Sequence, residues 1–300
     1  MTGLLLLDKP AGMTSFSAVN RVRRMLGVKK AGHTGTLDPM ATGVLPILLG
    51  GATRFAEFLP SHDKAYLAGF QLGLTTDTLD ITGRVLEERP VHASREDIEQ
   101  ALTPFRGKIM QVPPMVSALK KDGVRLYELA RQGIEVEREA RPVEIFTLEL
   151  VGDDQLYVEC SAGTYIRTLI DDLGRALGCG ATMTSLRRTK ANGYAIEQCH
   201  TLEELELRKT VILVDQLFLS YPEVRVTPAQ AVRFKNGGAL DLARLDLAGI
   251  EHSEALRMQT RPEEAKNPIE GELYRVYGET FLGLGRVQGE QLAIARLLVG

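Results

Sequence analysis

The chain has 300 residues, of which 44% are hydrophobic and 25% are charged, and its formal net charge at pH 7 is −3. This composition excludes wholesale disorder, a collagen-like repeat and a coiled-coil rod, and the length predicts one large domain, alone or with a small one. Taken alone, the slight negative charge argues against a nucleic-acid partner, since proteins that neutralise phosphates are usually basic.

No apolar run approaches the roughly 18 residues that a membrane span needs. The run at residues 3–7 is short and ends in Asp-Lys-Pro, so we expect neither a signal peptide nor a membrane anchor. The three cysteines, Cys160, Cys179 and Cys199, are odd in number and form no C-x-x-C pair. They predict reduced thiols, and together these features predict a cytoplasmic protein.

The first sixty residues predict a strand, a helix and a loop in that order. Residues 4–7 are a continuous apolar run that ends at a proline turn, which is typical of a buried strand. The helix that follows begins at Thr14 or Ser15 and ends at Gly27. The expected buried side of this helix carries Phe16, Val19, Val22 and Met25. Residues 29–43 hold four Gly or Pro residues and predict a structured loop without a regular element.

The middle of the chain mixes strands and helices irregularly. Expected strands are residues 64–73, 141–151 and 156–161, and expected helices are residues 94–102 and 126–133. The clearest helix follows Gly163, because residues 166, 169, 170, 173 and 177 are apolar at helical spacing and Gly178 can end it. Without a regular strand-helix alternation, an α+β fold is expected rather than a doubly wound sheet.

The pattern changes near residue 222. Expected elements are a strand at 223–226, a helix from Thr227 to residue 236, and strands at 273–276, 281–287 and 292–299. We therefore expect one domain at residues 1–221 and a small β-rich domain at residues 222–300. Residues 240–267 are expected to be an insertion or a variable linker.

Asp38 lies inside the glycine-rich loop, directly before a proline. One interpretation is structural, because an Asp before Pro is common at turns. The other is a nucleophile or general base, which needs a cation and a proton acceptor from elsewhere. Tyr165 and Arg167, at the start of the clearest helix, can supply both. An arginine within about 4–6 Å would keep Asp38 ionised, and its planar fork would hold the carboxylate in two directions; otherwise Arg167 is a solvated helix residue.

Ordered sequence blocks resemble one known family. Residues 32–45, GHTGTLDPMATGVL, resemble the catalytic-loop motif of the bacterial tRNA pseudouridine-55 synthases, the TruB family. Residues 5–15 resemble that family's opening. Further blocks are residues 64–66 with 76–80, residues 163–168 with 171–174, and residues 186–189. The resemblance covers about residues 3–215, and residues 272–276 and 281–285 more weakly resemble the PUA domain, an RNA-binding module.

The resemblance implies a fold and a reaction. The fold is α+β, with a mixed, largely antiparallel sheet, flanking helices and a small β-rich PUA-like domain. The reaction is the isomerisation of a flipped-out uridine in the TψC loop of tRNA to pseudouridine. No cofactor and no metal are expected, since the sequence shows no P-loop, no G-x-G-x-x-G and no metal-spaced His/Cys set. The expected partner is the TψC stem-loop, with no membrane and no obligatory protein partner, and a monomer is favoured.

The resemblance also implies residue roles. Asp38 would attack either ribose C1′ or the base, and the sequence does not choose between them. Tyr165 would lie close to the base and remove a proton, and Arg167 would pair with Asp38. Tyr66 would stack on the uracil, with Leu186 as another apolar wall. His33 would insert where the extruded nucleotide was, since imidazoles stack on bases and flipping leaves a gap; on spacing alone it would be a surface or turn residue.

Two further residues have alternative interpretations. Lys9 braces the loop or contacts a phosphate, or it is simply solvated beside its proline turn. Asp80 orients a nearby cation, or it makes an Asx turn. The pair Cys199 and His200 has no nearby ligands and is expected to be structural.

Three other functions compete with the leading one. The chain could be a non-catalytic RNA-binding or RNA-folding protein, which the set of Asp38, Tyr165 and Arg167 disfavours. It could be a hydrolase with an aspartyl nucleophile, such as a glycosidase, but the motifs offer no second carboxylate as acid. It could also be a relative that modifies another RNA.

Charge is segregated along the chain. Residues 1–60 hold seven Lys or Arg against three Asp or Glu, and residues 161–190 hold five against two. Residues 77–100 hold three against seven. The basic segments carry the motifs, so we expect a basic groove around Asp38, an acidic surface away from it, and tRNA binding that weakens as salt rises.

Overall fold

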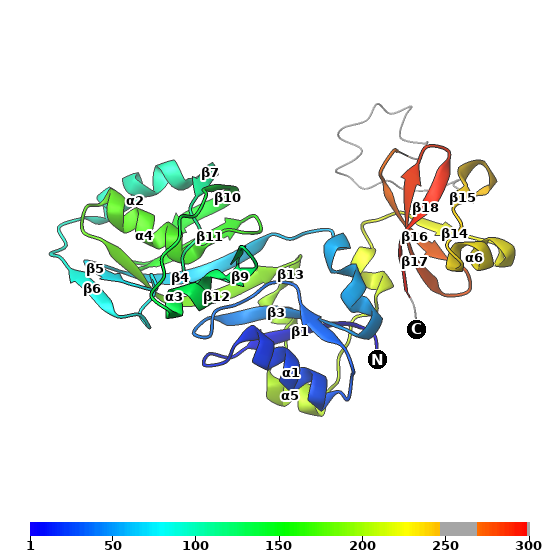
Figure 1. The fold of residues 1–300 in the computed structure, drawn as a ribbon, viewed down its shortest axis with the longest axis horizontal. Helices are drawn as coiled ribbons and strands as arrows, with labels where there is room; N and C mark the ends of the chain where they lie inside the picture. The colour runs from blue at the N-terminus through cyan, green and yellow to red at the C-terminus, as the bar shows by residue number, and fades with distance from the viewer. Residues whose placement is uncertain (247–268, 299–300) are drawn as a thin grey trace.

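A computed structural model describes residues 1–246 and 269–298 (Figure 1). In this part of the chain, residues 3–195 contribute a nine-stranded sheet and residues 223–297 a five-stranded one. None of the helices in these ranges is both long and apolar enough to cross a membrane.

The strands of the large sheet are β1 (Gly3–Lys9), β2 (Ala31–His33), β3 (Thr42–Leu49), β4 (Lys64–Leu72), β7 (Gly107–Gln111), β10 (Arg141–Leu150), β11 (Gln155–Cys160), β12 (Ala181–Ala191) and β13 (Tyr194–Ala195). Two small hairpins stand apart: β5 (Leu74–Thr76) with β6 (Val85–Glu88), and β8 (Lys120–Lys121) with β9 (Val124–Arg125). The helices around the large sheet are α1 (Ser15–Met25), α2 (Arg95–Leu102), α3 (Leu126–Arg131), α4 (Ile166–Ala176) and α5 (Leu202–Leu207). The 3-10 helices are η1 (Gly50–Phe58), η2 (Thr103–Phe105), η3 (Ile196–Gln198), η4 (Asp215–Phe218) and η5 (Leu242–Arg244).

The large sheet runs in the order β1-β3-β12-β4-β11-β10-β7, with β2 paired to β3 and β13 to β12. The pairs are antiparallel except β12 with β3, which are parallel at Arg187 and Arg188. The expected α+β class with a mixed, largely antiparallel sheet is therefore confirmed. Because β12 pairs with β4 along most of its length and also joins β3, it connects the two halves of the sheet.

Helix α4 forms where the apolar spacing predicts it. Its residues Ile166, Leu169, Ile170 and Leu173 are at most 4% exposed, and Gly178 lies just beyond its end with a φ of +75°. The helix packs on β12, and α2 packs on α4 (Figure 1). The predicted capping box at Ser94 is present at the start of α2.

Helix α1 also forms as predicted, with Thr14 as its N-cap, but its buried side differs from the expected one. Phe16 is 71% exposed, and the buried residues are Ser15, Ala18, Val19 and Val22. The expectation was wrong because steps of three residues fall about 60° short of a full turn, so Phe16 and Met25 lie on different sides of an α-helix.

Three strands near the motifs were not predicted. The loop at residues 29–43 contains β2, and β3 begins at its end, so the expectation of no regular element there was wrong. The short β2 tolerates Gly32 because it lies off the main strand path and pairs only with β3. Strand β12 has few apolar residues, and its central Arg188 is fully buried, so no hydrophobic pattern marks it.

The second sheet runs β14-β16-β17-β18-β15, with helix α6 (Pro228–Lys235) beside it. Its strands are β14 (Glu223–Arg225), β15 (Leu240–Asp241), β16 (Leu273–Tyr277), β17 (Phe281–Gln288) and β18 (Gln291–Leu297). This small β-rich C-terminal unit is consistent with the expected PUA-like domain. Leu240 pairs with β18, so the expected insertion at 240–267 begins inside this sheet; residues 247–267 lie outside the described ones.

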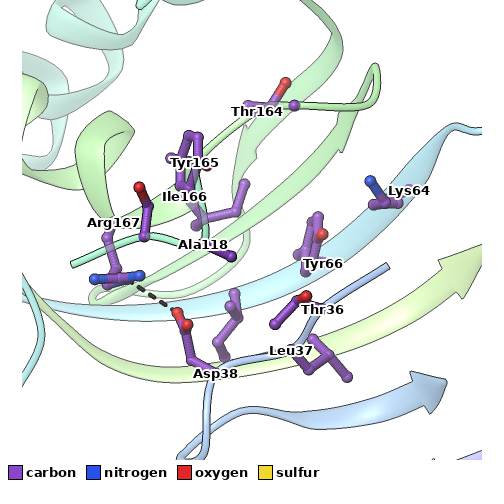
Figure 2. A pocket seen from close by; sticks show the side chains of 13 residues that line it. Thr36, Leu37, Asp38, Lys64, Tyr66, Ala118, Thr164, Tyr165, Ile166 and Arg167 are labelled. Atoms are coloured by element: carbon purple, nitrogen blue, oxygen red, sulfur yellow. Dashed lines mark ion pairs between the residues drawn. The ribbon is translucent and has the colours of Figure 1, made fainter. Parts of the chain in front are cut away.

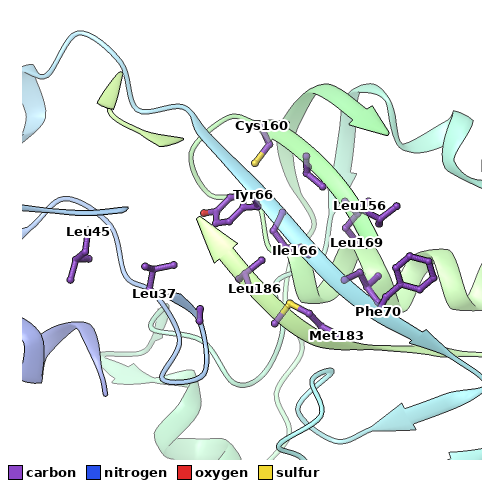
Figure 3. Packing of buried hydrophobic residues seen from close by; sticks show 14 of the residues in the cluster. Leu37, Leu45, Tyr66, Phe70, Leu156, Cys160, Ile166, Leu169, Met183 and Leu186 are labelled. Atoms are coloured by element: carbon purple, nitrogen blue, oxygen red, sulfur yellow. The ribbon is translucent and has the colours of Figure 1, made fainter. Parts of the chain in front are cut away.

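The main hydrophobic core lies between the large sheet and its helices and extends into a cavity. Tyr66, Ile166 and Leu186 belong to this core, which Figure 3 shows around β4 and β12. All three also line the cavity described below. Of the cysteines, Cys160 and Cys179 are buried, Cys199 is partly buried and all are free thiols, as predicted. His200 exchanges backbone hydrogen bonds with β1, a structural role as expected.

Candidate active site

A cavity of about 250 Å³ opens between the Asp38 loop, β4, β12 and the start of α4 (Figure 2). It is lined by Thr36, Leu37, Asp38, Lys64, Tyr66, Ser117, Ala118, Gly163, Thr164, Tyr165, Ile166, Arg167 and Leu186. The fold thus brings together five of the sequence-predicted residues: Asp38, Tyr66, Tyr165, Arg167 and Leu186. His33, Lys9 and Asp80 lie outside the lining.

Asp38 and Arg167 form an ion pair at one side of the cavity. The Nε of Arg167 lies 3.0 Å from Oδ2 of Asp38, and the two side chains are 5% and 32% exposed. Figure 2 shows them facing each other from the loop and from the first turn of α4. The alternative interpretation of Arg167 as a solvated helix residue is therefore wrong. The carboxylate keeps solvent access while its counterion is buried, which suits a group that must stay ionised and meet a substrate.

The expectation that the guanidinium fork holds Asp38 from two directions is wrong. Only Nε faces Asp38; Nη1 donates to the carbonyl of Thr78 at 3.0 Å and Nη2 to the carbonyl of Val116 at 2.8 Å. The reason is burial, because a guanidinium this enclosed needs an acceptor for each of its nitrogens. Arg167 thereby ties Asp38 to two other segments that border the cavity.

Asp80 combines both of its predicted roles. Its Oδ1 accepts hydrogen bonds from the backbone N–H of Thr82 and from the hydroxyls of Thr78 and Thr82, which is an Asx-type turn. Its Oδ2 lies 3.9 Å from Nε of Arg167. Asp80 is 5% exposed, so it adds a second, buried negative charge behind the arginine.

The Asp38 loop is held from three directions. The hydroxyl of Ser15 accepts from the N–H of Leu37 at 2.8 Å and donates to its carbonyl at 3.0 Å. Lys9 donates to the carbonyls of Pro10, Met13 and Pro39. Arg188 donates to the carbonyls of Gly35, Thr36 and Val44. Side chains from outside the loop thus hold its backbone in place through hydrogen bonds.

Lys9 is fully buried, so its interpretation as a solvated lysine was wrong, and its donors brace the loop. Three of the twelve Lys or Arg counted in the two basic segments do not contribute to a basic groove, because Lys9, Arg167 and Arg188 are at most 4% exposed and donate to internal acceptors. Arg187 pairs with Asp8 at 2.8 Å. The three buried cations therefore stabilise the loop, whereas the other nine Lys or Arg of these segments are not buried.

Two tyrosines face the cavity and are neutral at physiological pH. Burial raises the pKa of Tyr66 to about 12, and burial also raises the pKa of Tyr165. Tyr165 is held by its backbone, because the side-chain amide of Gln111 on β7 accepts from its N–H at 2.8 Å and donates to its carbonyl at 3.0 Å. The ring of Tyr165 is thus fixed where β7 meets the start of α4.

His33 is half-buried in β2, and its Nδ1 is a buried atom with no hydrogen-bond partner in the described structure. Burial, reinforced by the nearby positive charge of Arg188, lowers the pKa of His33. Its imidazole is therefore neutral at pH 7. Among the described residues, no group of three or more His, Cys, Asp or Glu is placed to hold a metal ion.

The sequence interpretation missed four residues at the site: Lys64, Gln111, Ser117 and Arg188. Lys64 and Arg188 stand inside blocks that carry the family resemblance, so the signal was present for both. Gln111 and Ser117 lie in a stretch without a recognisable motif, and only the packing of β7 and residues 113–119 against α4 brings them to the cavity.

Two family models match the chain. One is described as TruB family pseudouridylate synthase, N-terminal domain, and matches residues 23–166. The other is described as tRNA pseudouridylate synthase B C-terminal domain and matches residues 167–216. Together they cover the large sheet from α1 onward and the whole cavity.

Curated relatives carry the same description along the full length. The tRNA pseudouridine synthase B of Azoarcus sp. is 45% identical over 307 residues, covering 99% of this chain and 94% of the relative. That of Clostridium kluyveri is 42% identical and covers all of both chains. That of Stutzerimonas stutzeri is 56% identical over 210 residues, or 69% of each chain.

Among solved structures, a chain in the crystal structure of a Cbf5-Nop10-Gar1 complex matches with a TM-score of 0.70 and 26% identity. The match covers 99% of this chain and 85% of that one. A chain in an archaeal box H/ACA Nop10-Cbf5 complex has a TM-score of 0.66 and 23% identity, which shows a shared fold.

Proposed function

The chain belongs to the TruB family of pseudouridylate synthases, and from this membership we propose that it isomerises one uridine in the TψC loop of tRNA, with Asp38 as the nucleophile. The membership makes it an isomerase that acts on RNA. The relatives that span its full length are named for tRNA, which supports tRNA as the substrate. We propose that it acts in the cytoplasm and needs no protein partner.

One observation carries the assignment of the nucleophile. Asp38 is a carboxylate within 3.0 Å of a buried arginine, on a braced loop, at a cavity walled by Tyr66, Tyr165 and Leu186. An aromatic face and an aliphatic wall suit a flat pyrimidine, and the carboxylate lies at the edge of that space. An exposed Asp–Pro turn would need none of these surroundings.

The reaction moves one bond and one proton. The bond between C1′ and N1 breaks, the base turns, and a bond between C1′ and C5 forms, after which C5 loses its proton and N1 holds one. Asp38 forms a transient covalent bond either to C1′ or to the ring, and both routes return it as a carboxylate. Arg167 pairs with the Asp38 carboxylate before the reaction and again when the carboxylate is regenerated.

Tyr165 is proposed to take part in the proton transfer from C5. Because its hydroxyl is protonated at neutral pH, it must pass its own proton on as it accepts the one from C5, and N1 is the final acceptor, so that the net transfer is from C5 to N1. Tyr66, which is neutral and almost fully buried, is proposed to stack on the uracil against Leu186.

A uridine inside folded RNA must leave its stack to reach the cavity, at a cost of a few kcal/mol. We propose that His33, whose neutral ring lies outside the cavity lining, fills the space that the base leaves. Asp80 and Lys9 are proposed to position Arg167 and the loop. We also propose that residues 1–221 form the catalytic domain and residues 222–300 a PUA-like RNA-binding domain.

The test is conversion of an unmodified tRNA transcript by purified protein without added cofactor. Pseudouridine has the same mass as uridine, so it is detected by chemical labelling read out by position. The wild-type chain should modify one uridine in the TψC loop, and Asp38→Asn should abolish conversion while still binding the transcript. Asp153→Asn is the matched control, because Asp153 is fully exposed and paired only with the surface residue Arg95.

Each competing function has its own outcome. Full conversion by the Asp38→Asn variant would show that Asp38 is not the nucleophile. If the wild type binds the transcript and leaves every uridine unchanged, the chain is a non-catalytic RNA-binding protein. If it modifies another RNA but not tRNA, that other RNA is its substrate.

A further inference from the structure

Lys64 is the second cation of the cavity and has no role in the proposed chemistry. It is the first residue of β4 and pairs in the sheet with Cys160 on one side and Ala191 on the other. Figure 2 shows its side chain on the far side of Tyr66 from Asp38 and Arg167. Its Cε and Nζ lie 3.4 and 3.9 Å from the position that a Cβ on Gly35 would occupy. The ammonium therefore stands beside the backbone of the catalytic loop, at the cavity.

Among the described residues, Lys64 makes no hydrogen bond and no ion pair, unlike the other cations around the loop. Arg167 meets Asp38 and two carbonyls, Arg188 donates to three carbonyls, and Lys9 donates to three carbonyls. Those cations hold the fold together. Lys64 makes no such contact among the described residues, although its side chain is only partly exposed.

The surroundings of Lys64 offset only part of its charge, because Cys160 and Asp63 raise its pKa by less than burial and Arg188 lower it. Burial lowers its pKa, and the nearby guanidinium of Arg188 lowers it further. The neighbouring thiol of Cys160 is neutral, since burial raises its pKa to about 11, and the carboxylate of Asp63 is exposed to solvent and forms no ion pair with Lys64. A partly desolvated ammonium without a partner in the protein points to an anionic partner in the ligand.

The polyanionic substrate carries its negative charge on phosphates. Uracil carbonyls are neutral, whereas a phosphate carries the charge opposite to that of the ammonium and makes short, charge-assisted hydrogen bonds with it. A lysine is also a flexible point charge, which suits a phosphate oxygen better than the planar edge of a base. Lys64 lies across Tyr66 from the Asp38–Arg167 pair, so it is placed to contact a different part of the nucleotide from the one that Asp38 attacks.

We propose that Lys64 binds a backbone phosphate next to the flipped uridine and so holds the nucleotide in the cavity. The proposal deepens the proposed function and rests on it, because it takes the substrate to be RNA with one extruded uridine. Lys64 is then a binding residue that acts on substrate affinity and leaves the bond rearrangement to Asp38, Arg167 and Tyr165.

The first experiment compares Lys64→Gln and Lys64→Arg with the wild type on a TψC stem-loop RNA. Loss of one charge-assisted hydrogen bond should lower kcat/KM about 10- to 100-fold through KM, with little change in kcat, and arginine should restore most of it. The slope of log affinity against log salt should fall by about 0.7–0.9. The control is Lys29→Gln, since Lys29 is an exposed lysine ahead of the same loop.

The second experiment combines the Lys64→Gln variant with changes to single phosphates of the RNA. A single neutral methylphosphonate replaces the phosphate on the 5′ or the 3′ side of the target uridine, and binding is measured in the inactive Asp38→Asn background. One of the two replacements should weaken binding of the Lys64 protein about tenfold and that of the Lys64→Gln protein not at all. Additive losses at both positions would falsify the proposal.

The design keeps three failures separate. A 2-thio or 4-thio substitution of the uracil tests contact with the base in the same way. If it weakens binding of the Lys64 protein but not of the Lys64→Gln protein, the ammonium contacts the base and the phosphate proposal is wrong. If Lys64→Arg and Lys64→Gln lose binding and thermal stability alike, Lys64 is structural and the proposal is again wrong. If the wild type converts no uridine, the proposed function fails, while the binding cycle still reports on Lys64.

Discussion

Arg167 joins three separate segments of the site through one guanidinium. Its Nε pairs with Asp38, and its two other nitrogens donate to the carbonyls of Thr78 and Val116. An arginine in this position supplies the counterion of the nucleophile and fixes its direction. At the scale of single residues, the site therefore depends on buried cations whose hydrogen bonds are all made inside the protein.

Replacing Arg167 tests this dependence. Arg167→Ala should lower the rate of conversion by about 10²–10³-fold, because the nucleophile loses its counterion and orientation. Binding of the RNA should stay within about threefold of wild type, since Arg167 is buried behind Asp38. Single-turnover rates and filter binding measure the two quantities. Arg175→Ala on the exposed side of the same helix is the control, and an equal loss of binding would place Arg167 in RNA contact instead.

Lys9 makes stability depend on pH in the alkaline range. Burial lowers its pKa from 10.5 to about 8, so between these values the unfolded chain binds more protons than the folded one. The free energy of unfolding therefore rises with pH from about 8 to about 10.5 on account of this group. Denaturant unfolding at pH 7.5, 9 and 10.5 should show the wild type gaining stability relative to Lys9→Met. A difference that stays flat across this range, or one shared by Lys29→Met, would contradict it.

Helix α4 and strand β12 form the element pair on which the site is built. The helix carries Arg167 in its first turn, and the strand carries Leu186 and Arg188. Gly174 lets them approach, because a Cβ on it would lie 2.1 Å from the backbone N of Ala181 and 2.4 Å from the carbonyl carbon of Gly180. Here packing outweighs intrinsic helix preference.

Gly174→Ala should therefore destabilise the protein, although alanine is the better helix former by about 1 kcal/mol. Overpacking against backbone atoms should lower the free energy of unfolding by about 2–3 kcal/mol, and the shifted helix should reduce conversion through Arg167. Denaturant unfolding and the conversion assay measure both effects. Gly152→Ala adds a methyl group in ordinary contact at 3.8 Å and should stay within about 0.5 kcal/mol of wild type. A stabilised Gly174→Ala protein would overturn the packing argument.

At the scale of the whole molecule, the two sheets share an apolar cluster. Phe55 of η1 lies 5.7 Å from Phe218 of η4 and 6.3 Å from Phe281 of β17, measured between ring centroids. Arg296 of β18 donates to Glu57 at 2.6 Å and lies over the ring of Phe58. The C-terminal sheet is thus packed against η1, which Figure 1 shows between the two sheets.

This contact predicts that the full chain unfolds in one cooperative transition. Phe281→Asp places an unpaired carboxylate in the shared cluster and should split the transition into two, because such a change costs several kcal/mol. Differential scanning calorimetry measures this, with Phe16→Asp at a 71% exposed position as the control. One transition at the wild-type temperature in Phe281→Asp would show that the shared cluster does not couple the two sheets.

The sequence by itself determined most helices, part of the strands, the α+β class and the family, although the apolar strand β3 was missed. These features depend on neighbours within a few residues, such as the caps of α1 and α2 and the apolar spacing of α4, or on motifs written in one stretch. Asp38, Tyr66, Tyr165, Arg167 and Leu186 could be named as site residues for the same reason.

Only the tertiary structure decided how these residues meet. Arg188 reaches the carbonyl of Gly35 across 153 residues, and Arg167 reaches that of Thr78 across 89. Such partners leave no local pattern, so the burial of Lys9, the single-nitrogen contact of Arg167 with Asp38 and the place of β12 within the sheet could not be predicted. The composition specifies how many charges the protein has, and the packing decides that Lys9, Arg167 and Arg188 hold the loop while Lys64 lines the cavity without a hydrogen-bond partner among the described residues.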